Sequence, residues 1–421
     1  MINALPVQLF CLVFTVSAIE HPQLIQVQMI IRHADRAPLF EFTSPESSRL
    51  FSRGLGEITN EGLLRVALQG TAFKLRYRSL GLLRDQMHDE EVHILLEEYS
   101  VENGHFLCIY SPQICVLYIF VRSSPMKRAL MSAAAFSAAF IASDQAPRVH
   151  TNDSVEDEKV LISDESLENR CQEPQDLHAV LENYRCSPNS VMKEFVKDFP
   201  DCEQFPYTKI EAAIAEMEHS AVELPSALEK CARGDGRKIQ FKSLSIKPID
   251  GSELNMTHAR DMIGPLMSIV TRNIGMAVTG GAVDGAKKDP LVFIYFTHAD
   301  ILLAAAQALG IIAEYEGKSP EFSSAIAIET WKTRDGFEIK AMVKDGLKNP
   351  FLHAAKYRLQ EFKSQIAPYT SLDQTNVQWD ANATSVYNFT QFDKDVRSEQ
   401  TSQVIITSER QEISGDITLP F

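Results

Sequence analysis

Two runs of β-forming residues each lead directly into a histidine, and this feature most limits the folds that the chain can adopt. QLIQVQMIIRH alternates and then becomes continuously apolar before His33. PLVFIYFTHAD reaches His298 and is followed by the helical sequence ILLAAAQALG, with Gly310 as its expected C-cap. Continuous apolar runs are typical of strands buried in a sheet. Strands that alternate with helices predict an α/β fold with ligands at the carboxyl ends of the strands.

Two further segments are predicted to be helical. Residues 51–80 contain a turn and then a helix, and Thr59 is its expected N-cap. One face of this helix carries Leu64, Leu68, Ala72 and Leu75. Residues 126–142 form a second, alanine-rich helical pattern, and residues 323–346 are typical of a hairpin of two strands.

A shift in composition divides the chain into parts. Residues 145–245 are acidic, carry four cysteines and show short helical patterns, which indicates an inserted cap. The α/β core is therefore expected at 19–144 and 246–375. The tail at 376–421 is polar and has no periodicity, so no structure is predicted for it.

The N-terminus favours a secreted protein. Residues 1–18 contain an apolar run that ends in Val16-Ser17-Ala18, which is typical of a signal peptide, although a buried N-terminal strand is an alternative. Four sequons fit a secreted surface, at Asn152, Asn255, Asn382 and Asn388. No later segment is long and apolar enough to predict a transmembrane anchor.

The mature chain would keep an even number of cysteines. Cys11 would leave with the signal peptide, and the remaining six are Cys108, Cys115, Cys171, Cys186, Cys202 and Cys231. Disulfides are expected in a secreted protein, but six cysteines allow fifteen pairings, and the sequence leaves the pairing open.

The net charge of −15 argues against nucleic acid as a partner. Any anion site must therefore be a local positive pocket in an acidic protein. Arg32, His33 and Arg36 provide such a cluster directly after the first strand. Neighbouring arginines would lower the pKa of the histidine and favour its neutral, nucleophilic form. The alternative is that both arginines form salt bridges and that His33 is a satisfied core histidine.

Two further strand ends carry charge. Arg122 ends a predicted strand, and a helix is expected to begin at Ser123 or Ser124, where backbone N–H groups could bind an anion. His298 ends another strand, with Asp300 two residues later. We expect these groups to converge at one edge of the sheet.

The order R-H-x-x-R-x-P, then VRSS…KRALMSA, then strand–His–acid–helix resembles the histidine acid phosphatases, which belong to branch 2 of the histidine phosphatase superfamily. That family includes prostatic and lysosomal acid phosphatases and phytases. The resemblance runs from about residue 24 to 372 and includes GLGEITNEG and YRLQEFKSQIAPYTSLD. It implies a mixed, mainly parallel sheet with helices on both faces and an inserted, smaller, mostly helical cap.

The resemblance also implies roles for individual residues. His33 would be the nucleophile that forms a phosphohistidine, and Asp300 would protonate the leaving alcohol. The phosphoryl oxygens would be bound by Arg32, Arg36, Arg122 and His298. No metal or other cofactor is implied, because the arginines neutralise the charge. The implied partners are a small phosphomonoester and, since members are commonly dimers, a second copy of the chain.

Three departures from the family pattern bear on activity. Ala34 stands where the family usually has glycine, so its methyl group could crowd the site. Ala299 separates His298 from its acid, as in the inositol-polyphosphate branch. Residues at about 100–121 fit no neighbouring pattern and are either an extra hairpin or translated intron sequence.

The predicted function is therefore a secreted or lysosomal acid phosphatase. A phytase-like or inositol-polyphosphate phosphatase is one alternative, suggested by the spaced acid. A catalytically weak secreted homologue that acts as a binding protein is another.

Overall fold

The computed structural model describes residues 21–83, 119–141, 149–151, 160–161, 198–219, 222–244, 256–279, 292–370 and 385–387. The expected signal peptide, all four sequons and residues 100–118 of the suggested insert lie outside these ranges. Cys108, Cys115, Cys171 and Cys186 also lie outside them.

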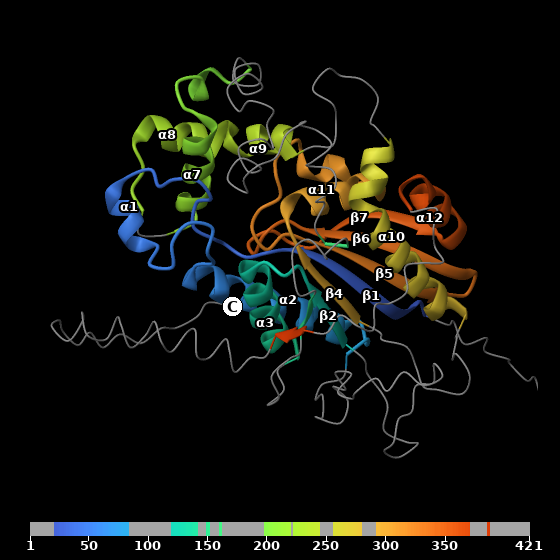
Figure 1. Ribbon diagram of the computed structural model, residues 1–421. Helices are drawn as coiled ribbons and strands as arrows, with labels where there is room; N and C mark the ends of the chain where they lie inside the picture. Colours follow the sequence, from blue (N-terminus) through green and yellow to red (C-terminus); the bar gives the residue numbers. More distant parts are fainter. Residues whose placement is uncertain are drawn as a thin grey trace, which may run out of the picture.

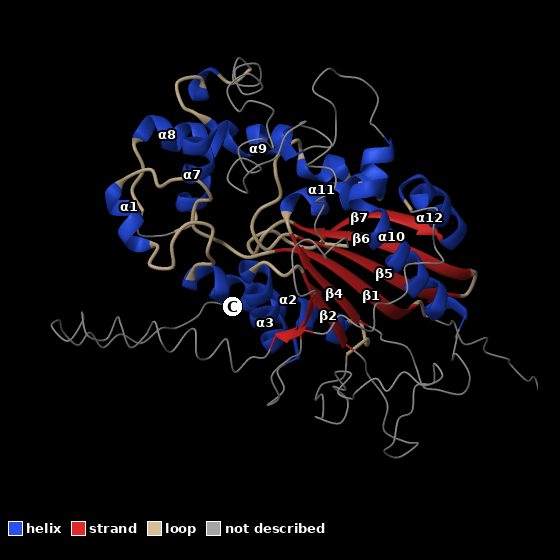
Figure 2. Cartoon of the chain, viewed as in Figure 1, coloured by secondary structure: helices blue, strands red, loops and turns tan. Residues whose placement is uncertain are grey.

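An eight-stranded sheet forms the centre of the protein, in the order β7-β6-β5-β1-β4-β2-β3-β8 (Figure 2). Its strands are β1 (Gln23–Arg32), β2 (Ile119–Ser123), β3 (Val149–Thr151), β4 (Val292–Thr297), β5 (Ala325–Thr333), β6 (Gly336–Lys344), β7 (Leu352–Arg358) and β8 (Ser385–Tyr387). The four central strands β1, β4, β2 and β3 pair in parallel, and all other pairings are antiparallel. The mixed sheet is confirmed, with its parallel part in the middle.

The predicted hairpin is confirmed as β5 and β6, with Gly336 at a φ of 122° in the turn. Two further strands were not predicted from the sequence. β3 belongs to the sheet although it falls inside the range expected for the cap, and β8 comes from the tail for which no structure was predicted. Residues 119–121 of the suggested insert belong to β2, in the parallel centre.

Helices cover both faces of the sheet (Figure 1). α2 (Asn60–Ser79) and α3 (Lys127–Ile141) pack on one face, in a core that includes Met29, Val121 and Phe136. The other face is covered by α10 (Met256–Thr279), α11 (Ala299–Ala308) and α12 (Leu359–Ile366). Two 3-10 turns, Ile312–Tyr315 and Ala367–Tyr369, follow α11 and α12.

Two capping residues predicted from the sequence are confirmed, and two other features of the helices differ from the prediction. The Thr59 side chain accepts a hydrogen bond from Gly62 N, which confirms it as the N-cap of α2. Gly310 follows α11 with a φ of 66°, as a C-cap glycine does. However, α3 begins at Lys127, later than the expected start at Ser123 or Ser124. The leucine face of α2 also points to solvent instead of the core.

A separate small core holds the cap together. α7 (Tyr207–Met217), α8 (Ser226–Cys231), a π-helical turn (Ala232–Gly236) and α9 (Arg237–Leu244) pack around Ile210, Leu228 and Ile239. The 3-10 turn Pro200–Cys202 is joined to α8 by a disulfide between Cys202 and Cys231. α1 (Pro45–Leu50) follows the loop after β1. The ring of Phe51, the residue after α1, packs against His219, which follows α7 in the chain.

Candidate active site

The parallel register brings three strand ends together. Arg32 at the end of β1 pairs with Thr297 at the end of β4, and Ser123 of β2 pairs with Phe296 on the other side of β4. His33 and His298 follow β1 and β4 directly, so their rings lie close, with centroids 5.3 Å apart and planes at 61°. The convergence expected from the sequence is therefore found for these two histidines.

A backbone hydrogen bond sets the tautomer of His33. Its Nδ1 lies 2.8 Å from the carbonyl oxygen of Ala34, and a carbonyl oxygen can only accept. Nδ1 must therefore carry the proton, and Nε2 of the neutral ring keeps its lone pair. Because His33 is only 3% exposed, the ring is held by its surroundings.

Burial and positive charge keep both imidazoles neutral. Burial is the largest cause that lowers the pKa of His33 far below its usual value, followed by the charges of Arg128, His298, Arg32 and Arg36. The pKa of His298 is lowered in the same way, by burial and then by the three arginines. A buried histidine that stays neutral in an acidic solution can still act as a nucleophile.

Arg32 is held from two sides. Its Nη1 donates a hydrogen bond to the carbonyl oxygen of Pro320, and its guanidinium carbon lies 4.1 Å from the ring centroid of Phe322. Phe322 also packs against the His33 ring, at 5.7 Å between centroids. Burial and the nearby charge of Arg36 lower the pKa of Arg32 to about 9, so it remains a cation at neutral and acidic pH.

Arg36 connects the site to the cap. Its Nη1 donates to Glu211 Oε1 of α7 at 2.8 Å, and the two side chains are 6% and 3% exposed. Glu211 Oε2 accepts a further hydrogen bond from Leu39 N at 3.0 Å. The inserted helix therefore positions both Arg36 and the loop that follows it.

Arg128 is a residue of the site that the sequence reasoning missed. It lies in the first turn of α3 and is the first among the charges that lower the pKa of His33 and of His298. Burial lowers its own pKa to about 10, and Asp300 is among the acids that oppose this shift. The sequence K-R-A-L-M-S-A at the start of the alanine-rich helix could have indicated Arg128 as a site residue.

Arg122 lies one residue before the end of β2, beside Tyr295 of β4. Burial raises the pKa of Tyr295, and the charge of Arg122 opposes this shift. The phosphate-binding role expected for Arg122 stays a prediction. The structure brings Arg32, Arg36 and Arg128 to the two histidines. These three guanidiniums each have a buried Nε without a hydrogen-bond acceptor in the part of the chain that the structure describes. Buried donors without acceptors are costly, and an oxyanion would satisfy such groups.

His298 and Asp300 lie at the start of α11. The His298 Nε2 is 3.0 Å from the hydroxyl oxygen of Ser124, which lies just after β2. His298 is the N-cap residue of α11, and Asp300 lies half-buried in its first turn. The charge of Asp300 is among those that raise the pKa of Arg128, against the larger effect of burial.

The loop of Ala34 fits without strain. Among described residues other than glycine, positive φ is found at Glu316 and Ser323, so Ala34 needs no conformation reserved for glycine. Its N–H donates to the Ser132 hydroxyl of α3 at 2.9 Å. Its side chain is buried in the apolar core cluster.

Asp35 points away from the histidines toward the cap. Its Oδ1 lies 2.9 Å from Arg65 Nη1, which also binds Glu218 Oε2 at 2.8 Å. Burial raises the pKa of Asp35 despite this ion pair. Gly62 allows α2 to approach, since a Cβ there would lie 2.4 Å from the Asp35 carbonyl oxygen.

A pocket lies beside Phe322, with a volume of about 170 Å³. Its charged lining residues are Asp35, Arg65, Glu218, Glu321 and Lys348. Carboxylates therefore outnumber cations on its wall.

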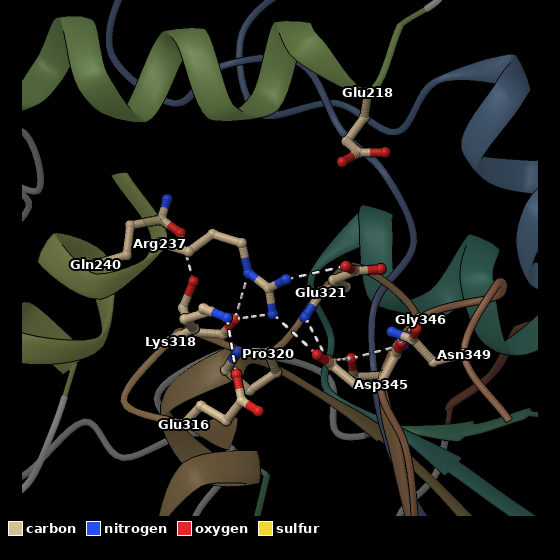
Figure 3. Close-up of polar contacts among 12 residues, drawn as sticks. Glu218, Arg237, Gln240, Glu316, Lys318, Pro320, Glu321, Asp345, Gly346 and Asn349 are labelled. Atoms are coloured by element: carbon tan, nitrogen blue, oxygen red, sulfur yellow. Dashed lines mark hydrogen bonds and ion pairs between the residues drawn. The ribbon is translucent and has the colours of Figure 1, made fainter. Parts of the chain in front are cut away.

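A second connection from the cap holds the loop that carries Phe322 (Figure 3). Arg237 of α9 donates to the carbonyl oxygen of Ser319 and forms ion pairs with Glu321 at 2.9 Å and Asp345 at 3.0 Å. Asp345 also accepts a hydrogen bond from Glu321 N at 2.8 Å. The cap thus positions Arg36 through α7 and the Phe322 loop through α9.

Comparison with known proteins agrees with this geometry. Residues 23–233 match the model of the histidine phosphatase superfamily, branch 2. The chain is 42% identical over 65 residues to a putative acid phosphatase 1 of Caenorhabditis elegans, an alignment that covers 15% of each protein. It is 34% identical over 99 residues to the testicular acid phosphatase of Mus musculus, covering 23% of each. These alignments span far less than the full length of either relative.

A solved structure resembles the whole fold. The apo form of Hafnia alvei phytase superimposes with a TM-score of 0.52 over 84% of this chain and 98% of that one, at 14% identity. This likeness supports the architecture of sheet and cap. The match of the family model extends from β1 through the site residues of α3 and into the cap. The chain therefore belongs to branch 2 of the histidine phosphatase superfamily.

Proposed function

We propose that this chain hydrolyses phosphate monoesters through a phosphohistidine formed at Nε2 of His33. One observation carries the proposal: the Nδ1–H of His33 is directed to the Ala34 carbonyl oxygen, and the ring is buried among three guanidiniums. Such a ring has a free lone pair on Nε2 and faces positive charge that would neutralise a phosphoryl group.

In the first step, Nε2 of His33 forms a bond to phosphorus as the bond from phosphorus to the leaving oxygen breaks. Arg32, Arg36 and Arg128 neutralise the phosphoryl oxygens, and His298 donates a hydrogen bond to one of them. The bond from Nδ1–H to Ala34 stabilises the positive charge that develops on the ring. This set adds Arg128 to the arginines expected from the sequence, and Arg122 keeps its expected place among them.

Asp300 serves as the acid. Its carboxyl group gives a proton to the departing alkoxide, which is a poor leaving group without it. In the second step a water molecule gives its proton to the Asp300 carboxylate and attacks phosphorus. The bond between nitrogen and phosphorus breaks, inorganic phosphate leaves, and both His33 and Asp300 return to their first state.

The substrate is a simple phosphomonoester rather than an inositol polyphosphate. The pocket beside Phe322 has Asp35, Glu218 and Glu321 on its wall. The cations on this wall are Arg65 and Lys348, and Arg65 is already paired with Asp35 and Glu218, so little unpaired positive charge remains there for the additional phosphates of a polyanion. Operation at acidic pH is consistent with this role, because the low pKa of His33 keeps Nε2 unprotonated there. Such conditions fit a secreted or lysosomal protein.

Rapid quenching into alkali, in which phosphohistidine is stable, after mixing with a ³²P-labelled phosphomonoester tests the proposal. The wild-type protein should form an acid-labile phosphoenzyme and hydrolyse nitrophenyl phosphate, whereas His33→Ala should do neither. His353→Ala is the matched control, because His353 is an exposed histidine on β7. A phosphoenzyme that persists in His33→Ala would refute the assignment. Faster turnover of inositol hexakisphosphate than of nitrophenyl phosphate would refute the substrate class.

A further inference from the structure

A buried glutamine interrupts the apolar face of α2 that packs on the sheet. Gln69 is 0% exposed and lies on the same face as Val66 and Phe73, which belong to the core. Its Nε2 donates a hydrogen bond to the carbonyl oxygen of Ser323 at 3.1 Å, and its Oε1 has no donor among the residues that the structure describes. A buried amide is costly unless it is hydrogen-bonded, so the contact with Ser323 is what compensates a polar side chain in this position.

Ser323 lies in a turn with an unusual backbone. Ser324 N donates to the carbonyl oxygen of Glu321 at 3.1 Å, which closes a turn around Phe322 and Ser323. The φ of Ser323 is 61°, and a turn with positive φ at its third position normally has glycine or asparagine there. The hydroxyl oxygen of Ser323 is buried and has no hydrogen-bond partner in the part of the chain that the structure describes. The serine side chain therefore does not stabilise this conformation by hydrogen bonding.

Two hydrogen bonds hold the backbone of Ser323 from opposite sides. Its N–H donates to the carbonyl oxygen of His33 at 3.1 Å, and its own carbonyl oxygen accepts the bond from Gln69. A residue keeps a strained backbone only where its surroundings hold it there. The strained residue is thus fixed between the candidate nucleophile and the buried amide of α2.

The turn places the ring of Phe322 on the site. β5 pairs with β1, and Arg32 N extends this pairing with a hydrogen bond to Ser324 O at 2.9 Å. The turn at Ser323 then brings the Phe322 ring to 4.1 Å from the guanidinium carbon of Arg32 and 5.7 Å from the His33 ring, measured from its centroid. The position of this ring therefore depends on the left-handed conformation of Ser323.

We propose that Gln69 is a positioning residue of the site. It acts through Ser323 and holds the Phe322 ring in its place. The ring in turn restricts Arg32 and His33, because it contacts both. The kinetic tests of this role rest on the phosphatase function proposed above, whereas the structural test does not.

Gln69→Leu is close to the wild type in size and cannot donate a hydrogen bond. It should reduce kcat/KM for nitrophenyl phosphate about three- to tenfold, the effect of losing one buried hydrogen bond. Gln365→Leu is the matched control, because Gln365 of α12 donates to the Ala308 carbonyl oxygen at the same 3.1 Å, at the end of α11 remote from His298. The control should keep the wild-type kinetics. An unchanged kcat/KM in Gln69→Leu, or an equal loss in the control, would overturn the proposal.

Gln69→Glu separates positioning from packing. A protonated carboxyl group can donate to the Ser323 carbonyl oxygen as the amide does, whereas a carboxylate can only accept. Burial should hold the pKa of this carboxyl above the ordinary value of about 4.3. The ratio of its kcat/KM to that of the wild type should therefore be near one at acidic pH and fall as the pH rises. Melting temperatures at each pH exclude unfolding as the cause. A ratio that does not change with pH, in a folded variant, would contradict the role of Gln69.

Crystal structures of the wild type and Gln69→Leu test the geometry without reference to turnover. In the variant, the φ of Ser323 should leave the left-handed region, or the Phe322 ring should move away from Arg32. Ser323→Gly adopts a positive φ without steric cost, so Gln69→Leu should reduce kcat/KM less in that background than in the wild type. If the wild type hydrolyses no phosphomonoester, the proposed function fails, and the crystal structures still decide the role of Gln69. Unchanged positions of Ser323 and Phe322 in Gln69→Leu would overturn it.

Discussion

Glu211 Oε1 of the cap accepts a hydrogen bond from Arg36 Nη1 of the core at 2.8 Å. Both side chains are almost completely buried, at 3% and 6% exposure. The cap is therefore part of the site, because one of its carboxylates fixes a cation beside the candidate nucleophile. Removing the negative charge should affect stability and turnover together.

Glu211→Gln should lower the free energy of unfolding by up to about 3 kcal/mol, since it leaves the buried Arg36 charge without its counterion. It should also reduce kcat/KM, because Arg36 is then less firmly held. Chemical denaturation and steady-state kinetics measure the two effects. Glu229→Gln is the control, because Glu229 forms an exposed ion pair with Arg233. Equal effects of both substitutions would contradict the role of Glu211.

Arg128→Ala should reduce kcat/KM for nitrophenyl phosphate by at least about 10²-fold, as loss of a donor that stabilises transition-state charge does elsewhere. Arg122→Ala should also reduce kcat/KM, because its guanidinium is expected to bind a phosphoryl oxygen. Melting temperatures of both variants separate lost activity from lost folding. An unchanged kcat/KM of either variant, with the fold intact, would exclude that arginine from the site.

The low pKa of His33 predicts a pH-dependent stability. The folded protein holds this histidine neutral, whereas the unfolded chain binds a proton below a pH of about 6.5. Stability should therefore fall as the pH decreases through that value, and it should keep falling until the pH reaches the folded pKa. Between pH 7 and 5 this single group should cost the wild type about 2 kcal/mol.

His33→Gln removes that group, so its free energy of unfolding should fall by about 2 kcal/mol less between pH 7 and 5 than that of the wild type. Denaturant titrations at the two pH values measure the difference. His353→Gln, an exposed histidine, should follow the wild type. If His33→Gln also follows the wild type, His33 titrates normally and the electrostatic account of the site is wrong.

Asp300→Asn should slow alkyl phosphates strongly, by about 10²–10⁴-fold, because their leaving alkoxide needs a proton. Nitrophenyl phosphate, with a good leaving group, should be affected much less. Asparagine has a polar side chain like that of aspartate and suits the first turn of α11, so folding should be preserved. Comparison of kcat for the two substrates gives the result. Equal rates for wild type and variant on an alkyl phosphate would exclude Asp300 as the acid.

The sequence by itself determined the parts of the site that follow buried strands. β1 and β4 were predicted from continuous apolar runs, and His33 and His298 follow them directly. Thr59, Gly310 and the β5–β6 hairpin could also be predicted, because capping and turn chemistry depends on a few neighbouring residues.

Contacts distant in sequence were decided by the tertiary structure alone. Arg122 and Arg128 lie six positions apart, and the pattern favoured the one at the strand end. The structure adds Arg128, in the first turn of α3, to the charges around the two histidines. The partnership of Arg36 with Glu211 joins residues 175 positions apart.

The leucine face of α2 has the period of a core-facing helix, and only packing reveals that Val66 and Phe73 occupy the core while Leu68 meets solvent. Periodicity identifies an apolar face, but it does not say whether that face is buried within the chain, because burial depends on which surfaces the other elements present.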